Sequence, residues 1–89
     1  MRVKVKIPKL GLTMTEATIV EWLKAVGEPV TAGEALLVIE TEKAEVEVEA
    51  PASGTLVEIV GAVRSVYPIG EVIAVIDMPG GGQGRGQPD

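Results

Sequence analysis

The chain repeats part of itself, and this repeat constrains the fold more than any other feature of the sequence. When residues 18–41 are laid over residues 55–78, a shift of 37 positions, nine of the 24 pairs are identical. The identical pairs are Thr18/Thr55, Val20/Val57, Glu21/Glu58, Ala25/Ala62, Val26/Val63, Gly33/Gly70, Glu34/Glu71, Val38/Val75 and Ile39/Ile76. Two copies with short strands indicate two halves of one domain, related by a rotation, and not a solenoid, which needs several stacked units.

Short segments rich in Val and Ile indicate the class of fold. The 89 residues include no Phe and one each of Trp and Tyr, so β-branched residues, which favour strands, must supply most of the core. The predicted strands are residues 2–7, 18–23, 35–40, 45–49, 55–60 and 72–77, and turns with at most a short strand after them are predicted at 27–30 and 65–68. We therefore predict an all-β fold, a flattened β-barrel or sandwich of two four-stranded antiparallel sheets with internal pseudo-two-fold symmetry.

Glycines and interrupted patterns add detail to this fold. Gly33 and Gly70 are equivalent in the repeat, and each marks a turn before a strand. The apolar runs 36–39 and 72–76 do not alternate cleanly, so each carries a β-bulge or is covered on both faces. Residues 79–89 contain no apolar side chain apart from proline. We predict one domain over residues 1–78, followed at 79–89 by a flexible Gly/Gln/Pro linker or an artificial tail.

The composition removes most kinds of catalytic site. The sequence contains no Cys and no His, which excludes disulfides, thiolate chemistry, Cys-type zinc sites and the usual general base. Hydrolysis by paired carboxylates needs a cleft that so small a sandwich seldom encloses. We therefore expect a chain with no autonomous enzymatic activity and no metal site.

The charge bears on the partners. The formal net charge is −5, and the eight Lys and Arg residues are scattered along the sequence. Nucleic-acid binding requires clustered basic residues, so we expect none, and protein partners with basic surfaces are favoured. No apolar stretch approaches about 18 residues, and residues 1–6 lack the apolar core of a signal peptide. We expect a soluble, cytoplasmic protein that does not bind a membrane.

Lys43 is the most distinctive reactive group. It lies within residues 40–44, Glu-Thr-Glu-Lys-Ala, between an apolar run and the alternating run 45–49. Two strands separated by a few polar residues predict a β-hairpin with the lysine at its exposed tip. In the second strand the glutamates should form the solvated face, with Val46 and Val48 directed inward.

The repeat also predicts where this tip lies. Lys43 is equivalent to Gly80, where the chain leaves the domain, so a two-fold axis would place the lysine and the chain exit at opposite poles. The segment 9–17 is longer than its counterpart 50–54 and should finish beside the lysine. The apolar residues of this loop, which could serve in packing or in recognition, are Leu10, Leu12 and Met14.

These residues resemble the lipoyl domain of the acyltransferase (E2) component of 2-oxo acid dehydrogenase complexes. The similarity is close over residues 7–24 and 33–44, and it covers nearly all of residues 1–78. In that family the hairpin lysine, here Lys43, carries lipoate in amide linkage. An Asp usually precedes it, where this chain has Glu42. The family's lysine is flanked by an acidic residue and Ala, here Glu42 and Ala44, and we predict that the recognition residues around Lys43 are Glu40, Thr41, Glu42, Ala44, Leu12 and Thr13.

The resemblance also concerns two further glycines. Positions 27 and 54 are typically glycine in the family, which implies structural turns at Gly27 and Gly54. The position that repeats Gly27 in the second half is often glycine as well, but here it is Arg64. Arginine tolerates a positive φ poorly, so the conformation of this turn does not follow from the sequence.

The function implied by the resemblance is that of a swinging-arm acyl carrier. Such a domain is loaded by a lipoate ligase or lipoyl transferase. It then serves a thiamin-diphosphate decarboxylase (E1), an acyltransferase core (E2) and a dihydrolipoyl dehydrogenase (E3). Trp22 and the segments 11–14 and 41–44 look more like pyruvate or acetoin complexes than 2-oxoglutarate complexes.

Three alternatives remain open from the sequence. A biotinyl carrier domain has the same fold and an equivalent lysine, but typically has Met on both sides of it, where this chain has Glu42 and Ala44. An unmodified adaptor would use the sandwich for protein contacts alone. Lys43 could also be an ordinary surface lysine that pairs weakly with neighbouring glutamates.

Overall fold

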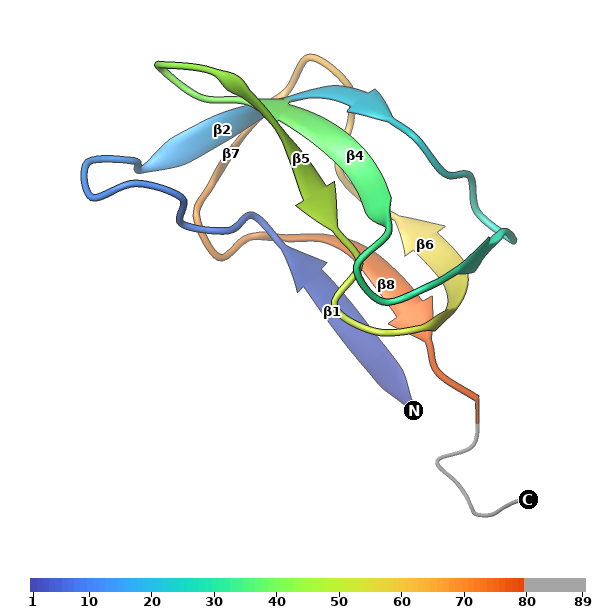
Figure 1. Ribbon diagram of the computed structural model, residues 1–89. Coiled ribbons are helices and arrows are strands. Elements are labelled where there is room, and N and C mark those ends of the chain that lie inside the picture. The colour runs from blue at the N-terminus through green and yellow to red at the C-terminus, as the bar shows by residue number, and fades with distance from the viewer. Residues whose placement is uncertain (80–89) are drawn as a thin grey trace.

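The computed structural model describes residues 1–79, which fold into eight strands joined by turns (Figure 1). The strands are β1 (Arg2–Lys6), β2 (Glu16–Trp22), β3 (Pro29–Val30), β4 (Ala35–Glu40), β5 (Glu45–Glu49), β6 (Gly54–Ile59), β7 (Val66–Pro68) and β8 (Val72–Asp77). Within this part of the chain, no helix is long and apolar enough to cross a membrane. The predicted tail falls almost entirely on residues 80–89, which lie outside the described part of the chain.

The strands form two four-stranded sheets. One has the order β1-β8-β6-β3 and the other β5-β4-β2-β7, and all neighbours are antiparallel. Each half of the repeat supplies strands to both sheets, so neither half has a sheet of its own and the two must fold together. The predicted all-β architecture of two four-stranded antiparallel sheets is confirmed.

Matching backbone hydrogen bonds show the predicted pseudo-two-fold symmetry. Gly27 donates its N–H to the carbonyl oxygen of Leu56 at 2.7 Å, and Arg64 donates to that of Ile19, also at 2.7 Å. Each residue in the second bond is 37 positions from its equivalent in the first. These bonds tie the loop that leaves one sheet to a strand of the other sheet, so they hold the two sheets together.

β-bulges explain the apolar runs that do not alternate. Leu36 of β4 has no partner in the register with β5, and its repeat equivalent Ile73 of β8 has none in the register with β1. A single extra residue lets two consecutive side chains face the same way. Leu36 and Leu37 are accordingly both fully buried, as are Ile73 and Ala74. Of the two explanations left open by the sequence, the structure shows the bulge.

Small aliphatic side chains from both sheets fill the core. The buried cluster is Val5, Ile7, Ala17, Ile19, Val30, Leu36, Leu37, Ile39, Val48, Ala50, Leu56, Ile73, Ala74 and Ile76. Trp22 and Tyr67 pack against its margin, and each makes a polar contact at the surface of the core. The Trp22 indole N–H donates to the carbonyl oxygen of Gly61 at 2.9 Å, and the Tyr67 hydroxyl oxygen accepts the N–H of Ala62 at 2.8 Å.

Three local predictions need correction. Gly54 was expected in a turn, but it is the first residue of β6 and has no positive φ. Glycine is required there because a Cβ atom would collide with the backbone carbonyl of Asp77 on the neighbouring strand. The short strands β3 and β7 lie within the segments predicted as turns, not after them. Gly27, Gly33 and Gly70 do adopt positive φ, as predicted for turn residues.

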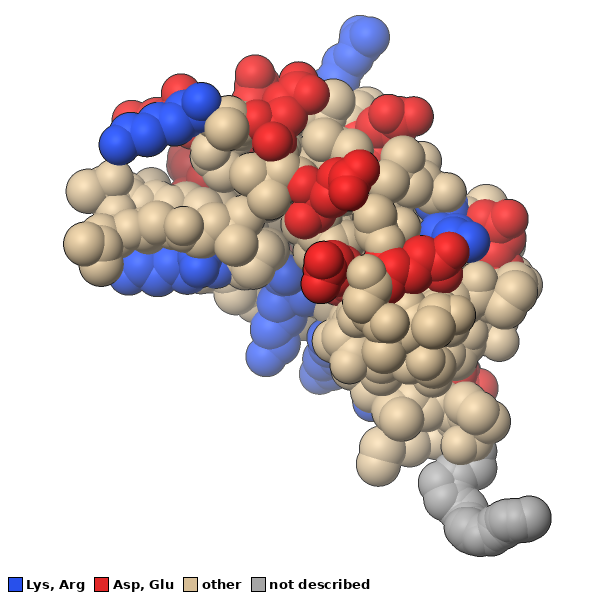
Figure 2. All heavy atoms as spheres, viewed as in Figure 1, with Lys and Arg blue, Asp and Glu red and all other residues tan. Residues whose placement is uncertain are grey.

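Three of the basic residues lie along one strand. Arg2, Lys4 and Lys6 occupy the exposed alternate positions of β1, an edge strand, because every second residue of a strand faces the same way. Residues 45–49 follow the predicted alternation, with the three glutamates exposed and Val48 buried. Figure 2 accordingly shows basic side chains gathered along β1 and acidic ones over β5.

Candidate functional site

A tight turn closes the hairpin between β4 and β5. Thr41 donates its backbone N–H to the carbonyl oxygen of Ala44 at 2.9 Å, and its hydroxyl Oγ1 donates to the same oxygen at 3.1 Å. Glu42 and Lys43 are the two residues between them, and neither has a positive φ. The turn therefore needs no glycine. The two hydrogen bonds from Thr41 to Ala44 fix the backbone from which the Lys43 side chain projects.

The Lys43 side chain is exposed and unpaired within the described part of the chain. The ion pairs among residues 1–79 are Met1 with Asp77 and Lys24 with Glu34, so no carboxylate of these residues lies within 4.0 Å of the Lys43 amine. The reading in which Lys43 pairs with neighbouring glutamates is not what the structure shows. Its amine is free to be approached from solvent.

The lysine and the two ends of the domain lie at opposite poles. Figure 1 shows the β4–β5 hairpin at one end of the molecule, and the start of β1 with the end of β8 at the other. Met78 donates its N–H to the carbonyl oxygen of Met1 at 2.7 Å, which holds the two ends together. Gly80, the predicted equivalent of Lys43, lies outside the described residues. A chain continuing from Pro79 therefore starts far from Lys43.

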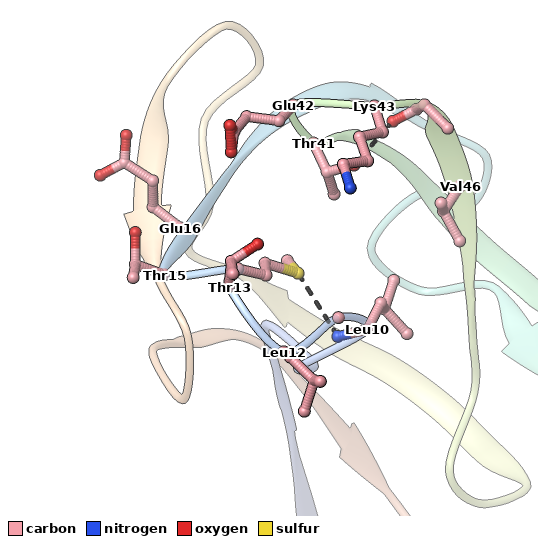
Figure 3. Close-up of a pocket in the computed structure, with 12 residues that line it drawn as sticks. Leu10, Leu12, Thr13, Thr15, Glu16, Thr41, Glu42, Lys43 and Val46 are labelled. Carbon is pink, nitrogen blue, oxygen red and sulfur yellow. Dashed lines mark hydrogen bonds between the residues drawn. The ribbon is translucent and has the colours of Figure 1, made fainter.

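A groove separates the hairpin tip from the loop between β1 and β2 (Figure 3). Its volume is about 670 Å³. The residues that line it are Leu10, Gly11, Leu12, Thr13, Met14, Thr15, Glu16, Thr41, Glu42, Lys43, Ala44 and Val46. The structure thus places this loop beside Lys43, as predicted from its greater length relative to residues 50–54.

The loop is folded around Met14. The Met14 thioether sulfur accepts the backbone N–H of Leu10 at 3.4 Å, and the Met14 N–H donates to the carbonyl oxygen of Gly11 at 3.3 Å. Met14 also packs against the core. Leu12 is instead 95% exposed. Of the two roles considered for the apolar residues of this loop, packing and recognition, Met14 serves in packing. Leu12 stays at the surface, where a partner could contact it.

The predicted recognition residues gather around Lys43 with one exception. Thr41, Glu42 and Ala44 in the hairpin and Leu12 and Thr13 in the loop all line the groove. Glu40 does not; it ends β4 and lies opposite Glu45 in the register of the hairpin.

Several residues for which no site role was predicted also line the groove, namely Gly11, Thr15, Glu16 and Val46. The alternation of β5 directs Val46 inward, which suggested only packing. The position of Glu16 follows from the pairing of β2 with β7, a contact between the two halves of the repeat. Glu16 nevertheless lies in the segment 9–17 that was predicted beside Lys43, so its proximity could have been found from the length of that loop.

Two side chains outside the groove, Lys24 and Glu34, have shifted pKa values. The Lys24 ammonium donates to Glu34 at 2.9 Å, and the Thr31 N–H donates to the same carboxylate at 3.0 Å. These bonds, the one from Lys24 first, lower the pKa of Glu34, and the bond to Glu34 raises the pKa of Lys24. Among residues 1–79, no group of three Asp or Glu side chains could hold a metal ion.

Comparison with known proteins gives a consistent result. Residues 3–76 match a family of biotin and lipoyl attachment domains described as "Biotin-requiring enzyme". The chain is 44% identical over 72 residues to the dihydrolipoyllysine-residue acetyltransferase component of the pyruvate dehydrogenase complex of Corynebacterium glutamicum. This match covers 81% of the chain and 11% of that protein. It is 46% identical over 77 residues to the succinyltransferase component of the 2-oxoglutarate dehydrogenase complex of Rickettsia conorii, covering 86% of the chain and 20% of that protein.

A solved structure agrees with these relatives. The solution structure of the lipoyl domain of the 2-oxoglutarate dehydrogenase complex from Azotobacter vinelandii superposes with a TM-score of 0.72 at 31% identity. The match covers 88% of this chain and 99% of that domain. The chain spans a fifth or less of the two curated relatives but nearly all of the isolated lipoyl domain. The chain therefore belongs to the biotin and lipoyl attachment family, as a lipoyl domain of the kind found in dihydrolipoamide acyltransferases and not as a catalytic domain.

Proposed function

We propose that Lys43 is the attachment site of lipoate, joined by an amide bond between the lysine Nζ and the lipoate carboxyl group. The observation that carries this proposal is the position of Lys43. It lies at the tip of a hairpin that Thr41 braces, it is exposed, and it is free of ion pairs within residues 1–79. An amine that an enzyme must acylate has to be reachable and held in a reproducible place.

Lipoate fits this site and would supply a dithiolane that carries acyl groups and electrons. The chain's own residues position it. Thr41 and Ala44 hold the turn, and Glu42 and Ala44 flank the lysine without covering it. We propose that a lipoate ligase or lipoyl transferase recognises Lys43 through these flanking residues, with Glu40, Leu12 and Thr13 nearby.

The geometry also suits transfer between separate active sites. The hairpin lies at the pole opposite Pro79, so a chain continuing from there would leave the arm facing outward. Tethering raises the concentration of such an arm near each partner site. We propose that the partners are a thiamin-diphosphate decarboxylase, an acyltransferase core and a dihydrolipoyl dehydrogenase. The acidic residues around the hairpin favour partners with basic docking surfaces.

We further propose a complex of the pyruvate or acetoin type. This choice rests on the resemblance of Trp22 and of the segments 11–14 and 41–44. The two relatives do not separate the substrate types, because an acetyltransferase component matches at 44% identity and a succinyltransferase component at 46%. The discriminating assay offers lipoylated domain to purified pyruvate and 2-oxoglutarate decarboxylases and compares the rates of acylation. Faster acylation by the 2-oxoglutarate enzyme would contradict the assignment.

Biotin is the second candidate for the attached group, because the family includes biotin-dependent enzymes. The residues flanking Lys43 favour lipoate, since neither is Met. The test incubates the domain in parallel with lipoate and lipoate ligase and with biotin and biotin ligase, and measures intact mass. The proposal predicts a single lipoyl increment and no biotin increment. A biotin increment alone would support the biotinyl carrier, and no increment with either competent ligase would support an adaptor.

A further inference from the structure

We propose that the groove beside Lys43 is a resting site for the prosthetic arm attached to that lysine, which lies along an apolar wall formed by Leu10, Met14 and Val46. This inference rests on the proposed function and adds to it. A freely swinging arm requires only that Lys43 be exposed. The groove gives the arm a second, folded position against its own domain.

The direction of the lysine side chain supports this position. Figure 3 shows the Lys43 amine directed into the space between the hairpin tip and the β1–β2 loop, not away from the domain. Lys43 itself lines the groove. An acyl chain joined to this amine would therefore start inside the groove and would not have to fold back to reach it.

The far side of the groove has the chemistry that a hydrocarbon chain requires. Leu10 and Val46 project toward each other across one end of the groove in Figure 3, and Met14 also lines the groove. Leu10 is half exposed, and Met14 and Val46 are only partly buried. The methylene groups of an eight-carbon acyl arm would remove apolar surface of these three residues from water, which is favourable.

The apolar residues of the groove are already held in place in the domain without an attached arm. Met14 accepts the N–H of Leu10 and packs on the core, while Val46 belongs to β5 and packs on the same core. Little conformational entropy would therefore be lost in forming the contact surface. The polar residues that line the groove lie away from Leu10 and Val46 in Figure 3; they are Thr13, Thr15, Glu16 and Glu42. The arm would therefore find apolar contacts on one side of the groove only.

Leu12 has a different orientation. Its side chain points away from the hairpin tip in Figure 3, and it is almost fully exposed. Leu12 could thus contact an approaching partner without touching the arm. This gives two leucines two positions apart in one loop with separable roles, and so a matched pair for substitution.

The test is methyl NMR on the domain before and after loading with lipoate, with intact mass recorded on each sample. The inference predicts that the methyl resonances of Leu10, Met14 and Val46 shift on loading, while those of Val26 and Val60 do not. It also predicts cross-relaxation peaks between arm methylene protons and the Leu10 methyl groups. A sample that is loaded by mass but shows neither the shifts nor the peaks would overturn the resting site and leave the carrier function intact.

Substitution separates this contact from general loop effects. In Leu10→Gln the arm should lose its cross-peaks to Met14 and Val46, whereas in Leu12→Gln those cross-peaks should persist. Val46→Thr, which keeps the side-chain shape, gives a second variant and should weaken the remaining contacts. Equal loss in Leu10→Gln and Leu12→Gln would contradict the assignment. Contacts that form only when a partner protein is added would show that the groove belongs to the partner. Failure of the domain to load at all would overturn the resting site together with the proposed function.

Discussion

Arg64 has a φ of 72°, in the left-handed region, at the position that the internal repeat pairs with Gly27, whose φ is 97°. Both residues donate their N–H to a strand of the opposite sheet at 2.7 Å. The backbone of the second half therefore keeps the conformation of the first, although the side chain there is one that this conformation disfavours.

Replacing Arg64 with glycine should stabilise the domain. Glycine adopts a positive φ without steric cost. The strain relieved in the folded state exceeds the conformational entropy that glycine adds to the unfolded chain, so we expect the free energy of unfolding to rise by about 0.5–1 kcal/mol. Gly27→Ala should destabilise by about 1–2 kcal/mol for the converse reason. Urea denaturation of both variants measures these changes, and Arg64→Lys, which leaves the backbone problem in place, should match the parent chain. A less stable Arg64→Gly would show that the turn is not strained.

Much of this fold could be predicted from the sequence because its signals are local and are repeated. Alternation in residues 45–49 predicted which side of β5 is buried, and the repeat predicted that Lys43 lies opposite the chain exit. The role of Gly54 could not be predicted, because it depends on the carbonyl of Asp77 on a neighbouring strand. The repeat predicted that the segment 9–17 lies beside Lys43, but not the groove between them, because a groove depends on how individual side chains such as Leu10 and Met14 are oriented.

Gly54→Ala should be strongly destabilising, since the new methyl group would meet backbone that cannot move aside. We expect a loss of about 2–3 kcal/mol, the upper part of the range for overpacking. Gly11→Ala is the matched control, because a Cβ atom there meets nothing within 4 Å and Gly11 has no positive φ. Its effect should stay within about 0.5 kcal/mol. Thermal denaturation distinguishes the two, and equal stability of both variants would contradict the packing described for β6 and β8.

Trp22→Phe removes the donor to the carbonyl oxygen of Gly61 and leaves that part-buried acceptor unsatisfied. We expect a loss of about 1–2 kcal/mol in the free energy of unfolding. Tyr67→Phe removes an acceptor from the N–H of Ala62 at an exposed position, where water can replace it, so the loss should be smaller. Denaturant titration of the two variants gives the comparison. A larger loss in Tyr67→Phe would contradict the argument that the part-buried bond of Trp22 contributes more than the exposed bond of Tyr67.

The pair of Lys24 and Glu34 should give the domain a pH-dependent contribution to stability. The pKa of Glu34 is lowered from 4.5 in the folded state, so this contribution is present above about pH 4.5 and is lost as the pH falls through the lowered pKa. Lys24→Met should raise the pKa of Glu34 toward 4.5, leaving only the lowering due to the Thr31 N–H. Carbon-detected NMR titration of the carboxyl group measures this pKa. Lys9→Met is the control, and the same shift in both variants would contradict a specific pair.

Site-resolved mass spectrometry shows whether the Lys43 amine is presented for modification. The domain and its Lys43→Arg variant are each incubated with lipoate and a competent lipoate ligase, digested, and mapped peptide by peptide. We expect complete modification at Lys43, none at Lys9 or Lys24, and none anywhere in Lys43→Arg. Modification that persists in Lys43→Arg, or an unmodified Lys43 in a folded domain, would contradict this expectation.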